Sequence, residues 1–234
     1  MATSSRSLHG QIVHELGRQI VAGHYGPGAI LPREDRLAEQ LQVSRTALRE
    51  SLRVLGSKGL IETRQKVGTR VREASHWNLL DPDVLAWHGA ALPNATFVEQ
   101  LAEMRELVEP GAAALAAQRR TDAQLACIRD AYDAMAAAGD MEAWAAADLR
   151  FHHAVLDATG NALLRPLFSV IETALGSYLL LSARKADADF KYSLPRHASV
   201  YEAIAARDPH AARQAMLDMI ADSRRNLRSG SQVP

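Results

Sequence analysis

Hydrophobic residues in the first third of the chain recur at helical spacing three times. The first repeat predicts a helix over 8–22, which the glycine-rich run GHYGPG ends. A short second helix follows Leu31, and a third runs from Ser44, a suitable N-cap, to about Lys58, with Gly59 as its stop. Two strand-like segments, 60–64 and 69–72, flank a QKVG turn. Three helices and a hairpin predict a winged helix-turn-helix over residues 1–74.

A different pattern begins near Glu73. Residues 75–94 contain two tryptophans and two prolines and predict a linker with a short helix at about 82–91. Beyond it alanine and leucine dominate, and the spacing predicts helices at about 95–118, 121–138, 140–159, 161–184, 195–207 and 209–228. We therefore expect a mainly α protein, in which a winged helix-turn-helix precedes an all-α bundle of six or seven helices over 95–234.

Charge is distributed unevenly along a chain whose formal net charge is zero. Residues 1–74 hold 12 Lys and Arg against 7 Asp and Glu, whereas residues 75–234 hold 15 against 20. A basic N-terminal part can supply the electrostatic attraction to phosphates. The single cysteine, Cys127, excludes an internal disulfide framework and is expected to be a buried thiol. No apolar run is long enough for a membrane span or signal core, so we expect a cytoplasmic protein.

The third predicted helix is amphipathic, with arginines on its polar side. Arg45, Arg49 and Arg53 recur every four residues and therefore share one face of a helix with 3.6 residues per turn. The opposite face is apolar enough to pack on a core and holds Ala47, Leu48, Ser51, Val54 and Leu55. Such a helix, placed after a helix and a turn, fits the major groove of DNA.

These patterns resemble a known family. The run IVAGHYGPGAILPREDRLAEQLQVSRTALRESLRVLGSKGLIE, closed by a wing with Gly68, is similar to the DNA-binding domain of GntR-type transcription regulators. ELVEP at 106–110, D-x-x-x-H at 148–152, Gly160-Asn161 and the helix-opening His197 resemble the FadR-type subgroup, whose effector domain is called FCD. WNLLDPDVLAWH at 77–88 and MLDMIADSRRNL at 216–227 are similar to members of the subgroup that sense the sugar acid D-galactonate. The resemblance covers about residues 8–228.

The arginines suggest how such a domain would bind DNA. Arg45 and Arg49 can reach base edges, because a guanidinium matches guanine bidentately, and Arg33 can reach a base or phosphate. Thr46 and Arg53 suit phosphates, while Lys66 and Gly68 belong to the wing. The resemblance implies operator contacts at the positions of Arg33, Arg45, Arg49 and Gly68. The competing interpretation is that the arginines form surface ion pairs with Glu34, Glu39 or Glu50.

A metal site is the main chemical candidate in the bundle. Asp148 and His152 are four residues apart, so they are neighbours on one helical face and can hold a divalent ion from one side. The resemblance adds His197 as the third ligand and places Met219 where a fourth, a histidine, is often found. A thioether is a poor ligand here, so we expect zinc, or nickel or manganese, on three protein groups. The alternative is an ordinary Asp–His hydrogen bond.

The resemblance also implies an effector site. Arg105 matches an arginine that often meets the effector in FCD domains, and its guanidinium suits a carboxylate. Ser193 lies near the pocket mouth in the same register and could bind a sugar hydroxyl. The alternative for Arg105 is a helical ion pair with Glu109, Glu99 or Glu103. A metal, an arginine and hydroxyl partners together indicate a small polyhydroxy acid.

The sequence therefore predicts a ligand-responsive transcription regulator and not an enzyme. We expect a repressor of a D-galactonate-like catabolic operon, a homodimer on a palindromic operator, which the bound effector releases. One alternative is a regulator that senses another acid, such as lactate, a hexuronate or a dicarboxylate. A metal-dependent enzyme using Asp148, His152 and His197 is less favoured, because it lacks a separate general base and leaves the helix-turn-helix unexplained.

Overall fold

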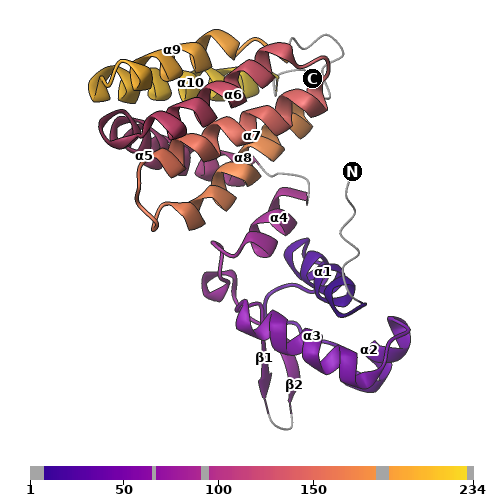
Figure 1. The fold of residues 1–234 in the computed structure, drawn as a ribbon. Coiled ribbons are helices and arrows are strands. Elements are labelled where there is room, and N and C mark those ends of the chain that lie inside the picture. Colours follow the sequence, from indigo (N-terminus) through magenta and orange to yellow (C-terminus); the bar gives the residue numbers. More distant parts are fainter. Residues whose placement is uncertain (1–7, 65–66, 91–94, 183–189, 231–234) are drawn as a thin grey trace. The chain divides into compact units, whose positions relative to one another are not determined.

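The chain forms two compact units, residues 1–92 and 93–234, each with its own hydrophobic core (Figure 1). The computed structural model describes residues 8–64, 67–90, 95–182 and 190–230. Unit 1 contains a small antiparallel hairpin and otherwise helices, and unit 2 is helical throughout its described residues. The predicted fold class, a winged helix-turn-helix followed by an all-α bundle, is confirmed.

Unit 1 opens with the three helices and the hairpin that the sequence predicts. The helices are α1 (Leu8–Val21), α2 (Glu34–Gln40) and α3 (Arg45–Ser57). Strand β1 (Ile61–Arg64) pairs with β2 (Gly68–Val71) in the register Ile61 opposite Val71. The Ser44 hydroxyl caps α3 by accepting a hydrogen bond from the backbone N–H of Ala47 at 3.2 Å. This bond satisfies one of the donors that a helix start leaves unpaired and fixes where α3 begins.

The segment that the sequence suggests as a linker packs into the core of unit 1. It contains a 3₁₀ turn, η1 (Ala74–His76), and helix α4 (Pro82–Ala90). Trp77, Val84 and Trp87 are buried in the same cluster as the apolar faces of α1 and α3. A Cβ at Gly17 would lie 2.3 Å from the Trp87 ring, so only glycine lets α1 and α4 approach this closely.

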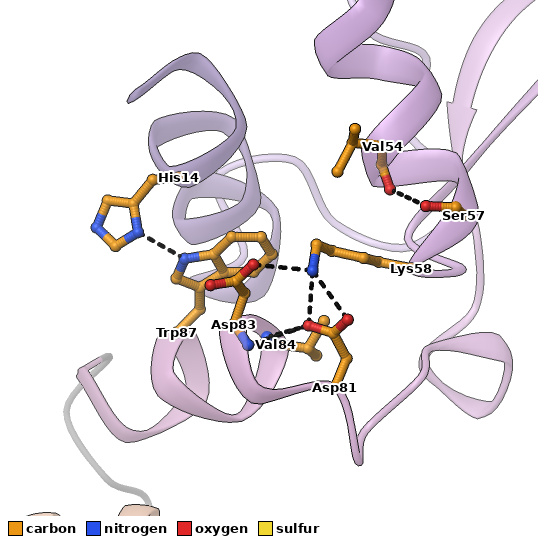
Figure 2. A network of polar contacts seen from close by, with 8 residues as sticks. All are labelled: His14, Val54, Ser57, Lys58, Asp81, Asp83, Val84 and Trp87. Atoms are coloured by element: carbon orange, nitrogen blue, oxygen red, sulfur yellow. Dashed lines mark hydrogen bonds and ion pairs between the residues drawn. The ribbon is translucent and has the colours of Figure 1, made fainter. Parts of the chain in front are cut away.

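A polar network ties the end of α3 to the start of α4 (Figure 2). The Lys58 ammonium lies 2.8 Å from carboxylate oxygens of both Asp81 and Asp83. Asp81 also accepts backbone hydrogen bonds from Asp83 and Val84, so it caps α4 as well. Burial lowers the pKa of Lys58, but the two carboxylates outweigh this effect and raise it. The ammonium therefore stays charged and holds α4 against the third helix.

Replacing Lys58 by methionine is expected to lower the free energy of unfolding of the protein by about 1–3 kcal/mol, the usual cost of removing one partner of a buried polar contact. The reason is that Asp81, whose side chain is 19% exposed, loses its counter-charge. Chemical denaturation followed by tryptophan fluorescence measures the change. The matched control is Asp83→Asn, whose side chain is 53% exposed and whose loss should cost under about 1 kcal/mol. Equal stability of Lys58→Met and the wild type would contradict the assignment.

Unit 2 is a bundle in which α5 packs on α10, α7 and α8, while α6 packs on α7 and α9. Thr121 and Gln124 form a reciprocal capping box at the start of α6, and the Asp140 side chain caps α7. Within the described residues the bundle consists of α5 (Ala95–Arg119), α6 (Asp122–Ala137), α7 (Met141–Ala158), α8 (Phe168–Ser182), α9 (Leu194–Ala205) and α10 (Pro209–Gly230). None of the described helices is both long and apolar enough to cross a membrane.

Two expectations for unit 2 need correction. The helix predicted from residue 161 begins at Phe168, after a turn and the 3₁₀ segment η2 (Arg165–Leu167). The Asn161 side chain accepts a hydrogen bond from the backbone of Leu163, which stabilises a turn, and Pro166 has no N–H for a helix to use. Cys127, expected to be buried, is exposed. Other residues of the same helix face the core. The alanine-rich pattern did not show which side of the helix would be buried, so it could not predict the exposure of Cys127.

Candidate functional site

The polar face of α3 is open to solvent and carries the arginines that the sequence predicts for DNA contact. Leu48, Leu52 and Leu55 of the same helix are buried in the core of unit 1, which holds the polar face outward. The exposed side chains of the candidate set are those of Arg33, Arg45, Thr46, Arg49 and Arg53. Gly68 opens β2 with φ +103°, a conformation that favours glycine. Lys66 lies outside the described residues.

Two of these arginines form the surface ion pairs that were weighed against DNA contact. Arg49 Nε lies 2.7 Å from Glu34, and Arg53 lies 3.5 Å from Glu50. Both arginine side chains remain largely exposed, at 68% and 81%. Exposed pairs of this kind contribute about 0–1 kcal/mol, so they can yield to a stronger partner. In the part of the chain that the structure describes, Arg33 and Arg45 make no ion pair.

The predicted metal ligands come together inside unit 2. Asp148 and His152 lie on α7 and His197 on α9, and all three are buried. One ligand atom from each lies within 4.8 Å of the others. The Nε2 atoms of His197 and His152 are 2.9 Å and 3.7 Å from Oδ1 of Asp148. Asp148 and His152 therefore share one face of α7, as the D-x-x-x-H spacing predicts, and this face meets the first turn of α9, as the resemblance implies.

Both histidines have an outer contact at their Nδ1 atoms. The Nδ1 of His152 is 2.6 Å from Oε2 of Glu109, which lies on α5, although the angles of this contact are not those of a good hydrogen bond. The Nδ1 of His197 is 2.9 Å from the backbone oxygen of Ser193, one turn earlier on the chain. With a proton on each Nδ1, the Nε2 lone pairs point to the shared position beside Asp148. Such outer contacts are typical of histidines that bind metals.

The electrostatics of the cluster favour ionised carboxylates. Burial raises the pKa of Glu109, but attraction to Arg105 and His152 outweighs it and lowers the value to about 2. Burial likewise raises the pKa of Asp148, but the close contact with His197 and the nearby positive charges outweigh it, so the net direction is down. The ring centroids of Phe151 and Trp144 lie 5.0 Å and 6.1 Å from the ring centroid of His197. These two rings form an apolar border on this side of the cluster.

The donor set fits a divalent metal ion. The Nε2 of His197 is buried and makes no hydrogen bond of good geometry, although Asp148 is close. A buried polar nitrogen of this kind is costly unless something binds it. Two imidazoles and one carboxylate are ligands that zinc accepts, and a three-residue set leaves positions open. Met219, in the place of a possible fourth ligand, is buried in the apolar core of unit 2.

The two predicted effector residues lie next to this cluster in different ways. Arg105 is 1% exposed, and its Nε is 2.5 Å from Oε1 of Glu109, which is the helical pair considered as its alternative. Ser193 is buried, and its backbone oxygen is the part that contacts His197. His153, by contrast, is 43% exposed and faces Asp157, away from the cluster. These positions leave effector contact by Arg105 and Ser193 as a proposal.

Sequence reasoning missed the central role of Glu109. It was considered only as a partner of Arg105, yet it also contacts His152 across the bundle. A signal was available: Glu109 is an acidic residue on the side of α5 that also carries Leu101, Ala102, Ala112 and Ala113, all buried. A carboxylate on an apolar helical face needs buried partners, and its two oxygens have room for more than one of them.

Comparisons with known proteins identify the family of each unit. The model described as "Bacterial regulatory proteins, gntR family" matches residues 8–71, and the FCD domain model matches residues 100–222. The galactonate operon transcriptional repressor of Escherichia coli K12 is 38% identical over 219 residues, or 93% of this chain and 96% of that protein. The HTH-type transcriptional regulator LutR of Bacillus subtilis 168 is 36% identical over 202 residues, or 83% and 90%.

A solved structure gives the same result. Streptococcus agalactiae GntR aligns with a TM-score of 0.51 and 30% identity, over 93% of this chain and 99% of its own. The first family match spans α1, α2, α3 and the hairpin of unit 1, and the second spans most of the bundle, including its buried cluster. Because these relatives regulate transcription, the alternative of a metal-dependent enzyme is wrong. The chain belongs to the GntR family of bacterial transcription regulators and carries a C-terminal FCD domain.

Proposed function

We propose that this regulator represses a sugar-acid catabolic operon and leaves its operator when a D-galactonate-like acid binds in unit 2. The observation that carries the proposal is the buried cluster of Asp148, His152 and His197 beside the guanidinium of Arg105. Such a cluster suits a small, oxygen-rich anion. The name of the Escherichia coli relative, a galactonate operon transcriptional repressor, supports the choice of acid.

The chemistry of the site suggests how the acid would be recognised. Asp148, His152 and His197 would hold a divalent ion, zinc or alternatively nickel or manganese, whose open positions accept oxygen ligands. Arg105 would take a carboxylate oxygen, because a guanidinium and a carboxylate form short, charge-assisted hydrogen bonds. The Ser193 side chain would bind a hydroxyl group. A carboxylate with a neighbouring hydroxyl satisfies these demands together.

The operator contacts would be made by unit 1. Arg33, Arg45 and Arg49 would read bases or adjacent phosphates, Thr46 and Arg53 would bind phosphates, and Lys66 and Gly68 would contact DNA from the wing. A homodimer on a palindromic operator is proposed, since one helix-turn-helix reads a short half-site and two-fold symmetry pairs two of them. Sedimentation equilibrium of the free protein is expected to give twice the chain mass.

The acid would act by shifting a conformational equilibrium. If one arrangement of the bundle binds the acid better than the arrangement that fits the operator, the acid populates the first and weakens DNA binding. By linkage, operator DNA must weaken acid binding by the same factor. No separate contact between acid and DNA is required.

A thermal-shift screen of sugar acids, with and without chelator, tests the ligand and the metal together. D-galactonate at 100 times its dissociation constant is expected to stabilise the protein by about 2.7 kcal/mol in the presence of zinc. A chelator is expected to remove most of this shift, because the acid then keeps only Arg105 and hydroxyl contacts. Lactate, a hexuronate and a dicarboxylate belong in the screen as the alternative effectors. A shift with one of them and none with D-galactonate would replace the proposed acid but keep the site.

A further inference from the structure

Glu109 joins the two halves of the proposed ligand site. Its Oε1 lies 2.5 Å from Nε of Arg105, and its Oε2 lies 2.6 Å from Nδ1 of His152. All three side chains are 1% exposed. Oε2 also accepts a longer hydrogen bond, 3.4 Å, from Nη2 of Arg105. The shortest contact of each carboxylate oxygen is nevertheless with a different neighbour: Oε1 with the residue that would receive an acid, and Oε2 with the residue that would hold a metal.

We propose that Glu109 is a positioning residue that couples these neighbours. One oxygen orients His152 for the metal, and the other occupies Arg105 until a carboxylic acid displaces it. The inference rests on the proposed function, because it requires both a metal and an acid at this site. It adds a mechanism by which the carboxylate of Glu109 controls the affinity for the metal and the affinity for the acid.

On the metal side, Glu109 acts through the tautomer of His152. Glu109 lies against the guanidinium of Arg105, and an ionised carboxylate can only accept hydrogen bonds, so it favours the tautomer of His152 that carries the proton on Nδ1, 2.6 Å from Oε2. A proton fixed on Nδ1 leaves Nε2 with a free lone pair, and this Nε2 is the atom that faces Asp148 at 3.7 Å. A negative charge behind the ring also makes Nε2 a stronger base. Glu109 therefore strengthens metal binding without touching the ion.

On the acid side, Glu109 acts as a competitor. The guanidinium of Arg105 is permanently charged and 1% exposed, so it needs a counter-charge in the absence of a ligand. Glu109 supplies that charge through Oε1. An incoming carboxylate must replace this contact, which weakens every acid by the same amount. An acid with further oxygen contacts in the site offsets this common cost, so Glu109 lowers the affinity for all acids and leaves the difference between them to the other contacts.

The substitution Glu109→Gln in the full-length protein separates the two roles, because it should move two affinities in opposite directions. Zinc titration of the metal-stripped protein by calorimetry is expected to show binding about 10–100-fold weaker than that of the wild type. Titration of D-galactonate in the presence of chelator is expected to show tighter binding, since the carboxylate of Glu109 no longer competes with the acid for Arg105. A substitution that only destabilised the bundle would weaken the binding of both zinc and D-galactonate.

The chain offers a matched control on the same helix. Glu106 pairs with Arg224 at 2.8 Å and makes no contact with the cluster among the described residues. Glu106→Gln removes one negative charge from α5, as Glu109→Gln does, and should leave both affinities unchanged. A second variant guards against misfolding: Arg105→Met combined with Glu109→Gln removes both buried charges and should show the same loss of zinc affinity.

The outcomes are distinct. Wild-type zinc affinity in Glu109→Gln and in the double variant would overturn the positioning of His152. D-galactonate affinity that is unchanged or weaker in Glu109→Gln would overturn the competition for Arg105. If the wild type itself binds neither zinc nor D-galactonate, the proposed function fails and this inference fails with it, a result that needs no variant to recognise.

Discussion

The Arg49→Ala variant is expected to bind the operator about 1–3 kcal/mol more weakly, or roughly 5- to 150-fold, with relaxed specificity at one base pair. Arg49 lies on the open face of α3, and its side chain is 68% exposed. Its ion pair with Glu34 is a weak surface contact. This contact can orient the guanidinium, but it is too weak to prevent the guanidinium from binding a guanine of the operator. Fluorescence anisotropy of a labelled operator at fixed salt measures the loss.

The matched control for Arg49 is Arg53→Ala, one turn further along the same face. Arg53 is also paired at the surface, with Glu50, and is 81% exposed. If Arg53 contacts a phosphate, the variant should bind all sequences more weakly by the same factor. The slope of log affinity against log salt concentration should fall by about one. If the two variants lose the same affinity on the operator and on a scrambled site, the assignment of Arg49 to a base fails.

The His197→Ala variant is expected to lose zinc binding by more than the 10–100-fold typical of an outer contact, because it removes a ligand. His197 is the residue that closes the cluster from α9, and its buried Nε2 makes no hydrogen bond of good geometry. Calorimetric zinc titration of the metal-stripped protein measures the change. The zinc-dependent part of the thermal shift by D-galactonate should disappear as well.

His153→Ala tests whether the loss is specific to the cluster. His153 is next to His152 on α7, but its side chain is 43% exposed and contacts Asp157. This variant should keep wild-type zinc affinity and the wild-type response to acid. Zinc binding that survives His197→Ala, or falls equally in His153→Ala, would show that the metal binds elsewhere.

Local chemistry made much of the fold predictable. Ser44 and Gly59 mark the ends of α3 in the sequence, and the structure places both as expected: Ser44 caps the helix, and Gly59 has φ +79°. A Cβ at Gly59 would lie 2.3 Å from the carbonyl oxygen of His76, so the same glycine also permits a close contact. The Thr121–Gln124 capping box is equally local. Short-range signals of this kind can be read without knowing the tertiary structure.

Contacts between distant residues were not predictable in this way. The placement of α4 depends on Lys58 with Asp81, on Trp87 packed against Gly17, and on a 2.8 Å hydrogen bond from Trp87 to His14, 73 residues away. The spacing of hydrophobic residues predicts that this segment is a helix, but it does not predict which surface the helix packs against. The resemblance to FCD domains predicted that His197 lies with Asp148 and His152. Their spacing along the chain could not predict this, because His197 is on another helix. Glu109 was missed because its second partner lies on another helix.

We propose that an acid bound in the bundle releases the operator, and anisotropy of labelled operator DNA at fixed salt tests this release directly. A suitable probe is the operator that the wild-type protein selects from a random DNA library. With zinc present, D-galactonate is expected to weaken operator binding about 5- to 150-fold, the usual range of allosteric coupling, and a chelator should suppress the effect. Operator affinity that stays unchanged with D-galactonate and with every other acid tested would contradict the account.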